Sequence, residues 1–263
     1  MLSYPHIDPV AISLGPLKVR WYGLMYLIGF LAVYFIGQRR AKRPWSPIPP
    51  EAVEDLVTYG ALGTILGGRI GYILFYNFGK LLDDPLVLFK IWEGGMSFHG
   101  GMLGVFAAMW FLKKKYQCTV LQLTDFIAPL APIGLGAGRI GNFINSELWG
   151  RVTDVPWAMI FPNGGDIPRH PSQLYEAFLE GIVLYFILWL YTLKQRPAMA
   201  PTGLAMLCYG CFRFFAEFFR MPDAHLGFIW LNWVTMGQIL STPMILIGGL
   251  MLGFAYKKQK PWA

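Results

Sequence analysis

The sequence has little charge and almost no cysteine. Charged residues make up 14% of the 263 residues, whereas hydrophobic residues make up 55%. This apolar content exceeds what a soluble core requires, so composition predicts a membrane protein. The three cysteines are too few for a disulfide framework. The single Cys-x-x-Cys spacing, Cys208 to Cys211, lies in an apolar run without a second ligand pair, so we interpret these cysteines as packing residues.

Several catalytic patterns are also missing from the sequence. It contains no Walker A loop, no Gly-x-Ser-x-Gly elbow and no His-Glu-x-x-His pattern. Nucleotide hydrolysis, serine hydrolysis and zinc proteolysis therefore have no support. We expect no metal site and no organic cofactor. We also expect no cleavable signal peptide, because the first residues are polar and the first apolar run lacks a small-residue cleavage site.

The net charge of +7 reflects short basic clusters at the ends of apolar runs. Twelve of the 22 lysine and arginine residues lie in four such clusters, at 38–43, 113–115, 194–196 and 257–260. There is no basic stripe interleaved with aromatic residues, so we expect no nucleic-acid partner. Clustered cations mark the cytoplasmic ends of membrane spans.

Seven apolar segments alternate with these clusters and predict an all-α polytopic membrane protein. The expected segments are 21–37, 56–75, a third from about 101 to 112, a fourth from 120 into the stretch 138–150, and then 177–193, 202–219 and 233–256. The alternation places the N-terminus outside and the C-terminus in the cytoplasm. We expect residues 1–263 to form one integral-membrane domain.

Two of the segments carry further signals. In the second, Gly63, Gly67 and Gly71 recur at the small-xxx-small spacing that lets membrane helices approach closely. Arg69 projects from the opposite face of that helix and needs its own polar partner. The fourth segment is interrupted by prolines and glycines, which predicts a bent or discontinuous helix beside a cavity.

Polar side chains gather at the expected outer ends of the segments. The stretch 138–150 carries Arg139, Asn142 and Glu147 among glycines, and hydrocarbon tolerates none of these unpaired. Tyr22 opens the first segment and His99 opens the third. The sixth ends in a stripe at helical spacing, made of Tyr209, Arg213, Glu217 and Arg220. We expect these groups to converge on one cavity that opens outward.

Two interpretations of this polar set remain open. In the first, Arg213 neutralises Glu217 at i and i+4, and Arg139 similarly pairs with Glu147, so that both pairs only join helices. In the second, the set contains more arginine than carboxylate, and the excess guanidinium implies an anionic ligand such as a phosphate. His99 likewise has a structural and a catalytic interpretation.

The stretch 138–150 resembles the signature of the prolipoprotein diacylglyceryl transferase family. Five further blocks resemble that family in the same order: 20–26, 67–72, 94–101, 169–176 and 209–223. The resemblance implies a bacterial inner-membrane enzyme of seven spans with a periplasmic active site. It implies transfer of the diacylglyceryl group of phosphatidylglycerol to the lipobox cysteine thiol of a preprolipoprotein, with release of glycerol phosphate. The partners would be phosphatidylglycerol, lipobox peptides and membrane lipids.

By motif position, the resemblance implies functional roles for ten residues. They are Tyr22, Arg69, His99, Arg139, Asn142, Glu147, Gly150, Tyr209, Arg213 and Glu217. Chemically, Arg139 and Arg213 suit a phosphate clamp, because negative charge grows on the leaving phosphate. His99 is the candidate base for the thiol, with Tyr22 as a further catalytic candidate. The remaining six are expected to bind phosphatidylglycerol. The short outer loop 151–168 is longer in some members, which leaves its part in peptide binding open.

Two other function classes compete with a lipid transferase. A transporter or flippase for an anionic substrate also uses intramembrane arginines on broken helices, but it commonly has internal repeats and polar groups near the midplane. An acyltransferase acting on lipid tails would require a histidine–carboxylate pair. No carboxylate follows His99 at the expected offset, where Gly104 stands.

Overall fold

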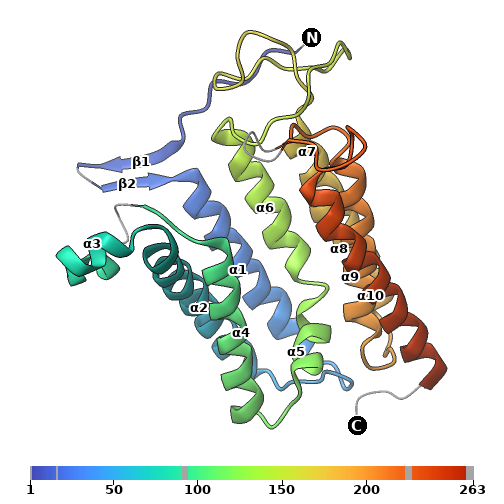
Figure 1. Cartoon of the computed structure of the whole chain (residues 1–263). Coiled ribbons are helices and arrows are strands. Elements are labelled where there is room, and N and C mark those ends of the chain that lie inside the picture. Colours follow the sequence, from blue (N-terminus) through green and yellow to red (C-terminus); the bar gives the residue numbers. More distant parts are fainter. Residues whose placement is uncertain (1, 16, 91–93, 223–226, 259–263) are drawn as a thin grey trace. The chain divides into compact units, whose positions relative to one another are not determined.

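The computed structural model describes residues 2–15, 17–90, 94–222 and 227–258 (Figure 1). They fall into two compact units, Met1–Val33 with Thr124–Ala263, and Tyr34–Leu123. The elements are β1 (Val10–Leu14), β2 (Leu17–Arg20), α1 (Trp21–Ala41), α2 (Glu51–Tyr76), α3 (Phe78–Asp83), η1 (Pro85–Phe89), α4 (Phe98–Lys115), α5 (Val120–Ile127), α6 (Ala131–Ile144), α7 (Ser172–Glu176), η3 (Ala177–Val183), α8 (Leu184–Tyr191), α9 (Ala200–Ala216) and α10 (Met236–Lys258). The helical class predicted from the sequence is confirmed. The expectation of a single domain stays a prediction.

Membrane-capable helices are present, as composition predicts. Among the described residues, three helices are long and apolar enough to cross a membrane: α1, the continuous run Ser172–Tyr191, and α10. The pair α5 and α6 is bent by 58° at a short break and makes a possible fourth span. This break confirms the predicted discontinuity of the fourth segment. Each of the seven expected segments coincides with a helix or helix pair, but seven crossings and the orientation of the termini stay predictions.

Helices α2 and α4 of the second unit pack through glycine. A Cβ atom at Gly63 would lie 2.5 Å from the carbonyl oxygen of Gly104, and one at Gly67 would overlap the carbonyl oxygen of Gly100. The predicted close approach of a glycine face is therefore confirmed, because no larger side chain fits there. Figure 1 shows the two helices side by side.

Arg69 lies on the other face of α2 and is buried. Its guanidinium donates to the carbonyl oxygens of Gly94 and Gly95, and to that of Val87 at 2.7 Å. The required polar partner is thus backbone, and Arg69 holds the connection between α2 and α4 against α2.

In the first unit, α6 packs against the π-helical segment η3 through two glycines. A Cβ at Gly136 would lie 2.9 Å from the Cα of Gly181, so neither position accepts a side chain without displacement. Asp125 of α5 accepts from the backbone N–H groups of Met199 and Thr202 at 2.8 and 3.0 Å. This buried carboxylate caps the positive end of α9, where an anion is stabilised. Helices α9 and α10 lie side by side (Figure 1).

The polar segments that precede α1 and follow α6 have a structure of their own, which the sequence did not predict. Strands β1 and β2 form an antiparallel hairpin leading into α1. Tyr4 belongs to a small apolar cluster with Phe143, Met159 and Phe161. Its hydroxyl donates to the carbonyl oxygen of Phe143 at 2.6 Å. The N-terminal segment therefore fixes the end of α6, where the polar stretch begins.

Candidate active site

Arg139 lies on α6, one turn beyond the glycine contact with η3. Its Nε lies 2.8 Å from Oε2 of Glu176 and 3.2 Å from Oε2 of Glu180, and its Nη2 also lies 3.2 Å from the latter atom. Both glutamates are within 1% of complete burial, whereas the Arg139 side chain keeps 17% of its surface exposed. Two buried carboxylates therefore hold the Nε–Nη2 edge of a guanidinium whose side chain is partly exposed.

Arg213 lies on α9 and shares one of these carboxylates. Its Nη1 donates to Oε1 of Glu176 at 2.9 Å, and its Nη2 pairs with Oε1 of Glu217, at i and i+4. The Arg213 side chain is 12% exposed. Because Glu176 binds Arg139 through one oxygen and Arg213 through the other, this carboxylate sets the spacing of the two guanidinium groups.

Glu217 is itself held by the start of α10. The Thr235 hydroxyl donates to its Oε2 at 2.5 Å, and a Cβ at Gly237 would lie 2.5 Å from its carboxyl carbon. Thr235 and Gln238 form a reciprocal capping box, with Thr235 N–H donating to the Gln238 side chain at 3.0 Å and Gln238 N–H to the Thr235 hydroxyl at 3.3 Å. The cap thus positions the Thr235 hydroxyl that donates to Glu217, and Gly237 beside it leaves room for the Glu217 carboxylate.

These contacts define the arginine–glutamate cluster. Its members are Arg139, Arg213, Arg220, Glu176, Glu180 and Glu217, with Arg220 lying 3.6 Å from Glu217. The cluster contains three arginines and three glutamates. The expected excess of arginine over carboxylate is therefore wrong for this cluster, because Glu176 and Glu180 also belong to it.

The first of the two interpretations paired Arg139 with Glu147, whereas Arg139 in fact pairs with Glu176 and Glu180. Oε1 of Glu147 accepts from the Asn142 amide at 2.8 Å and from the Asn145 amide at 3.3 Å. The chain turns sharply at this point, with positive φ at Ser146 and Leu148. The turn directs Glu147 back toward the end of α6, where two amides satisfy it. By contrast, the predicted pairing of Arg213 with Glu217 is confirmed.

Gly150 lies where three segments meet. A Cβ there would lie 2.5 Å from the carbonyl oxygen of His170 and 2.6 Å from that of Phe219, so the position requires glycine. The next residue, Arg151, donates to the carbonyl oxygens of Glu217 and Arg220, both at 3.0 Å. A cation at these carbonyls stabilises the C-terminal end of α9, which contains Arg213 and is followed directly by Glu217.

Two tyrosines lie close to the cluster. Tyr209 is on α9, one turn before Arg213, and interacts electrostatically with Glu180 and Arg139. Tyr22 of α1 lies against α6, where a Cβ at Gly141 would lie 2.8 Å from its ring, and it interacts with both Glu147 and Arg139. The structure thus brings Tyr22, Tyr209 and the two arginines into one region, as expected.

His99 and Arg69 belong to the second unit. His99 follows the N-cap of α4, where the Ser97 hydroxyl accepts from Gly100 N–H at 3.2 Å, and its side chain is exposed. Its predicted approach to the arginines stays a prediction. Arg69 binds backbone within its own unit, and its predicted lipid contact also stays a prediction.

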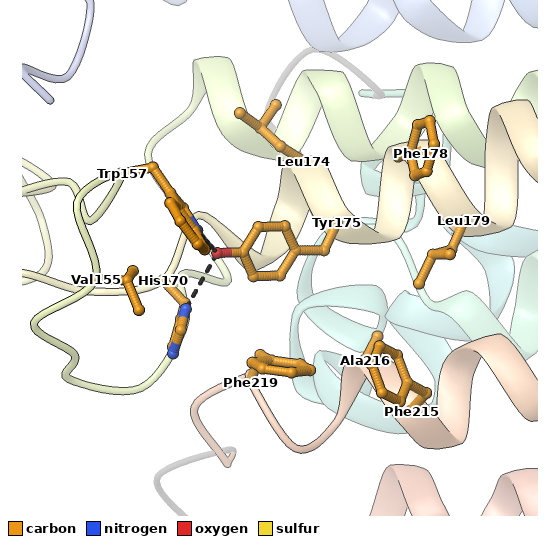
Figure 2. A pocket seen from close by; sticks show the side chains of 10 residues that line it. All are labelled: Val155, Trp157, His170, Leu174, Tyr175, Phe178, Leu179, Phe215, Ala216 and Phe219. Carbon is orange, nitrogen blue, oxygen red and sulfur yellow. Dashed lines mark hydrogen bonds between the residues drawn. The ribbon is translucent and has the colours of Figure 1, made fainter.

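An apolar cavity of about 470 Å³ adjoins the same helices (Figure 2). Its lining residues are Val155, Trp157, His170, Leu174, Tyr175, Phe178, Leu179, Phe215, Ala216 and Phe219. At one end the Trp157 indole donates to the Tyr175 hydroxyl at 2.7 Å, and His170 Nδ1 lies 3.1 Å from that hydroxyl. Partial burial lowers the pKa of His170, which keeps this end neutral. The cavity suits an apolar ligand of small-molecule size.

Comparison with known proteins agrees with the resemblance in the sequence. A model of the family described as prolipoprotein diacylglyceryl transferase matches residues 9–254. The chain belongs to this family. A Pseudomonas aeruginosa (strain PAO1) protein named phosphatidylglycerol--prolipoprotein diacylglyceryl transferase is 57% identical over 259 residues, which cover 98% of this chain and 97% of the relative. A Coxiella burnetii (strain RSA 331) protein of the same name is 56% identical over 260 residues, 99% of this chain and all of the relative.

The family match covers all ten candidate residues but assigns no role to any of them. Sequence reasoning missed Glu180 and Thr235, and Glu176 entered it only as the last residue of the block 169–176 that resembles the family. Glu180 had a visible signal, because it is a lone carboxylate inside the apolar run 177–193, and an ionisable residue in such a run is a candidate functional group. The capping pattern Thr235 to Gln238 was equally legible.

Proposed function

We propose that this chain transfers the diacylglyceryl group of phosphatidylglycerol to the lipobox cysteine of preprolipoproteins. Membership of the prolipoprotein diacylglyceryl transferase family supports this reaction. The observation that carries it is the pair of accessible guanidiniums, Arg139 and Arg213, joined by the buried Glu176. Within the described residues, Nη1 of Arg139 and Nε of Arg213 contact no carboxylate. A phosphodiester needs such preoriented donors.

The reaction follows as a displacement at carbon. The cysteine sulfur attacks the terminal glycerol carbon of the lipid, so that a C–S thioether bond forms while the C–O bond to phosphate breaks. Glycerol phosphate leaves with the electron pair of that bond. Negative charge therefore grows on the phosphate oxygens, where Arg139 and Arg213 stabilise it. The thiol proton passes to a base, for which His99 is our candidate.

The other candidate residues support this site. Asn142 and Glu147 bind one another at the end of α6, and we propose that they orient the headgroup beside Arg139 together with Tyr22. We propose that Tyr209 and Glu217 fix Arg213 on its helix, and that Gly150 keeps the chain close enough for Arg151 to cap α9. The apolar cavity beside α9 is compatible with an acyl chain of the same lipid.

The membrane supplies the lipid, so the site must open toward it. We propose seven spans in a bacterial inner membrane, with the N-terminus and the active site periplasmic and the C-terminus cytoplasmic. The cation clusters at 38–43, 113–115, 194–196 and 257–260 support this orientation. No metal or organic cofactor is required by the displacement, because the phosphate is a sufficient leaving group.

The proposal is tested with purified protein, labelled phosphatidylglycerol and a lipobox peptide. We expect the peptide mass to rise by one diacylglyceryl group, located on the cysteine, and glycerol phosphate to appear in equal amount. A peptide in which serine replaces that cysteine is the control and should stay unmodified. An unchanged cysteine peptide, or lipid moved without covalent transfer, would contradict the proposal and favour a carrier.

A further inference from the structure

Counted over the residues that the structure describes, the arginine–glutamate cluster carries no net charge when all of its side chains are ionised. Three glutamates oppose its three arginines. Adding the neighbouring Arg151 and Glu147 leaves the balance unchanged. A phosphodiester headgroup brings one further negative charge into a region where the carboxylates are almost fully buried. Uncompensated charge is unfavourable in such surroundings, and a buried group changes its protonation state instead.

One carboxylate oxygen of the cluster is placed to receive a proton. Glu180 is fully buried, and the two hydrogen bonds that it accepts from Arg139, from Nε and Nη2, both reach the single oxygen Oε2. Its Oε1 is buried and has no hydrogen-bond partner among the residues that the structure describes. Glu176 and Glu217, by contrast, use both oxygens.

We propose that Glu180 takes up one proton from solution when an anionic lipid headgroup binds at Arg139 and Arg213. The inference rests on the proposed function. The proton adds to Oε1, which becomes a hydroxyl group, while Oε2 continues to accept from Arg139. The charge of headgroup and cluster together then remains zero. The side chains of Arg139 and Arg213 at the same cluster are partly exposed.

The groups that face Glu180 come from every helix packed against it. Arg139 approaches from α6, Glu176 from α7, and Arg213 and Tyr209 from α9. The two arginines favour the ionised carboxylate, whereas Glu176 opposes it. An anion bound to the arginines reduces their effect on Glu180 and adds repulsion of its own. Binding therefore shifts the balance in one direction, toward the protonated acid.

The test is calorimetry on the full chain in detergent, titrated with short-chain phosphatidylglycerol. Measurements in two buffers of different ionisation enthalpy give the number of protons taken up. In the pH range where the free carboxylate is ionised and the lipid-bound one is protonated, the wild type should take up about one proton per lipid, and its affinity should fall about tenfold per pH unit. Neutral diacylglycerol with the same chains should take up none.

Two variants locate the proton. Glu180→Gln replaces the carboxyl by a neutral amide of similar size, so its lipid binding should take up no proton and lose the tenfold dependence. Asp166→Asn makes the same chemical change at an exposed loop position and should behave as the wild type. Equal uptake in Glu180→Gln and the wild type would overturn the inference.

If Glu180→Gln does not fold, the proton uptake of the wild type alone tests the inference. Binding of phosphatidylglycerol without proton uptake would overturn the inference while leaving the proposed function intact. Absence of both lipid binding and transfer to a lipobox peptide would overturn the two together.

Discussion

The most informative single substitution is Glu176→Gln, because this carboxylate joins the two arginines. The glutamate accepts from Arg139 at 2.8 Å and from Arg213 at 2.9 Å. An amide has one acceptor oxygen, so it keeps one of these contacts, now between a charged donor and a neutral acceptor, and turns its NH₂ group toward the other guanidinium.

The size of the effect follows from hydrogen-bond energies. A hydrogen bond to a charged group contributes about 1.5–3 kcal/mol and a neutral one about 1 kcal/mol. Losing one charged bond and weakening the other removes about 3 kcal/mol of interaction energy. If the spacing of the arginines matters only when charge develops on the phosphate, the activation free energy rises by the same amount. At about 1.4 kcal/mol per factor of ten, kcat/KM should fall about a hundredfold.

The assay is transfer from labelled phosphatidylglycerol to a lipobox peptide, with helical content checked by circular dichroism. Glu54→Gln is the matched control, because Glu54 is an exposed glutamate on α2. If folded Glu176→Gln had the same kcat/KM as Glu54→Gln, the shared carboxylate would not position the arginines for catalysis.

Three further outcomes are expected. Gly67→Ala should lower the apparent Tm by several degrees, since overpacking costs about 1–3 kcal/mol. The control is Gly60→Ala on the same helix, which should not lower the Tm because nothing lies within 4 Å of its Cβ. Arg151→Gln should cost about 1–2 kcal/mol by freeing two carbonyls at the end of α9, and an unchanged Tm would contradict that capping role. For His170 the folded pKa is below the ordinary 6.5, so the unfolded chain takes up its proton first as pH falls. Wild-type Tm should therefore drop more than that of His170→Gln between neutral pH and about pH 5, and parallel curves would contradict this.

Much of the fold was predictable because a membrane restricts spanning backbone to helices, and because glycines at small-xxx-small spacing predict a close helix contact. The periodic glycines 63, 67 and 71 were sufficient to predict one packed face, and the breakers in residues 126–137 predicted the bend between α5 and α6. The hairpin and the cluster around Tyr4 were not predictable, since they depend on contacts between residues far apart in sequence.

The candidate site was predicted in its residue types more than in its pairings. Local spacing correctly paired Arg213 with Glu217. It paired Arg139 with Glu147 because the two are near in sequence, whereas the actual partners lie on η3 and α7. Ion pairs between helices depend on which faces meet, and a single sequence does not contain that information. Including the buried Glu176 and Glu180 in the polar set would nevertheless have corrected the charge balance.

The central claim is that the phosphate headgroup binds between Arg139 and Arg213. It is tested most directly by photocrosslinking with phosphatidylglycerol that carries a diazirine on its headgroup glycerol, followed by peptide mapping. The account predicts adducts on α6 and α9 near these arginines, competed by unlabelled phosphatidylglycerol and strongly reduced in the double variant Arg139→Gln, Arg213→Gln. Competed adducts confined to other segments, and unaffected by the double variant, would contradict it.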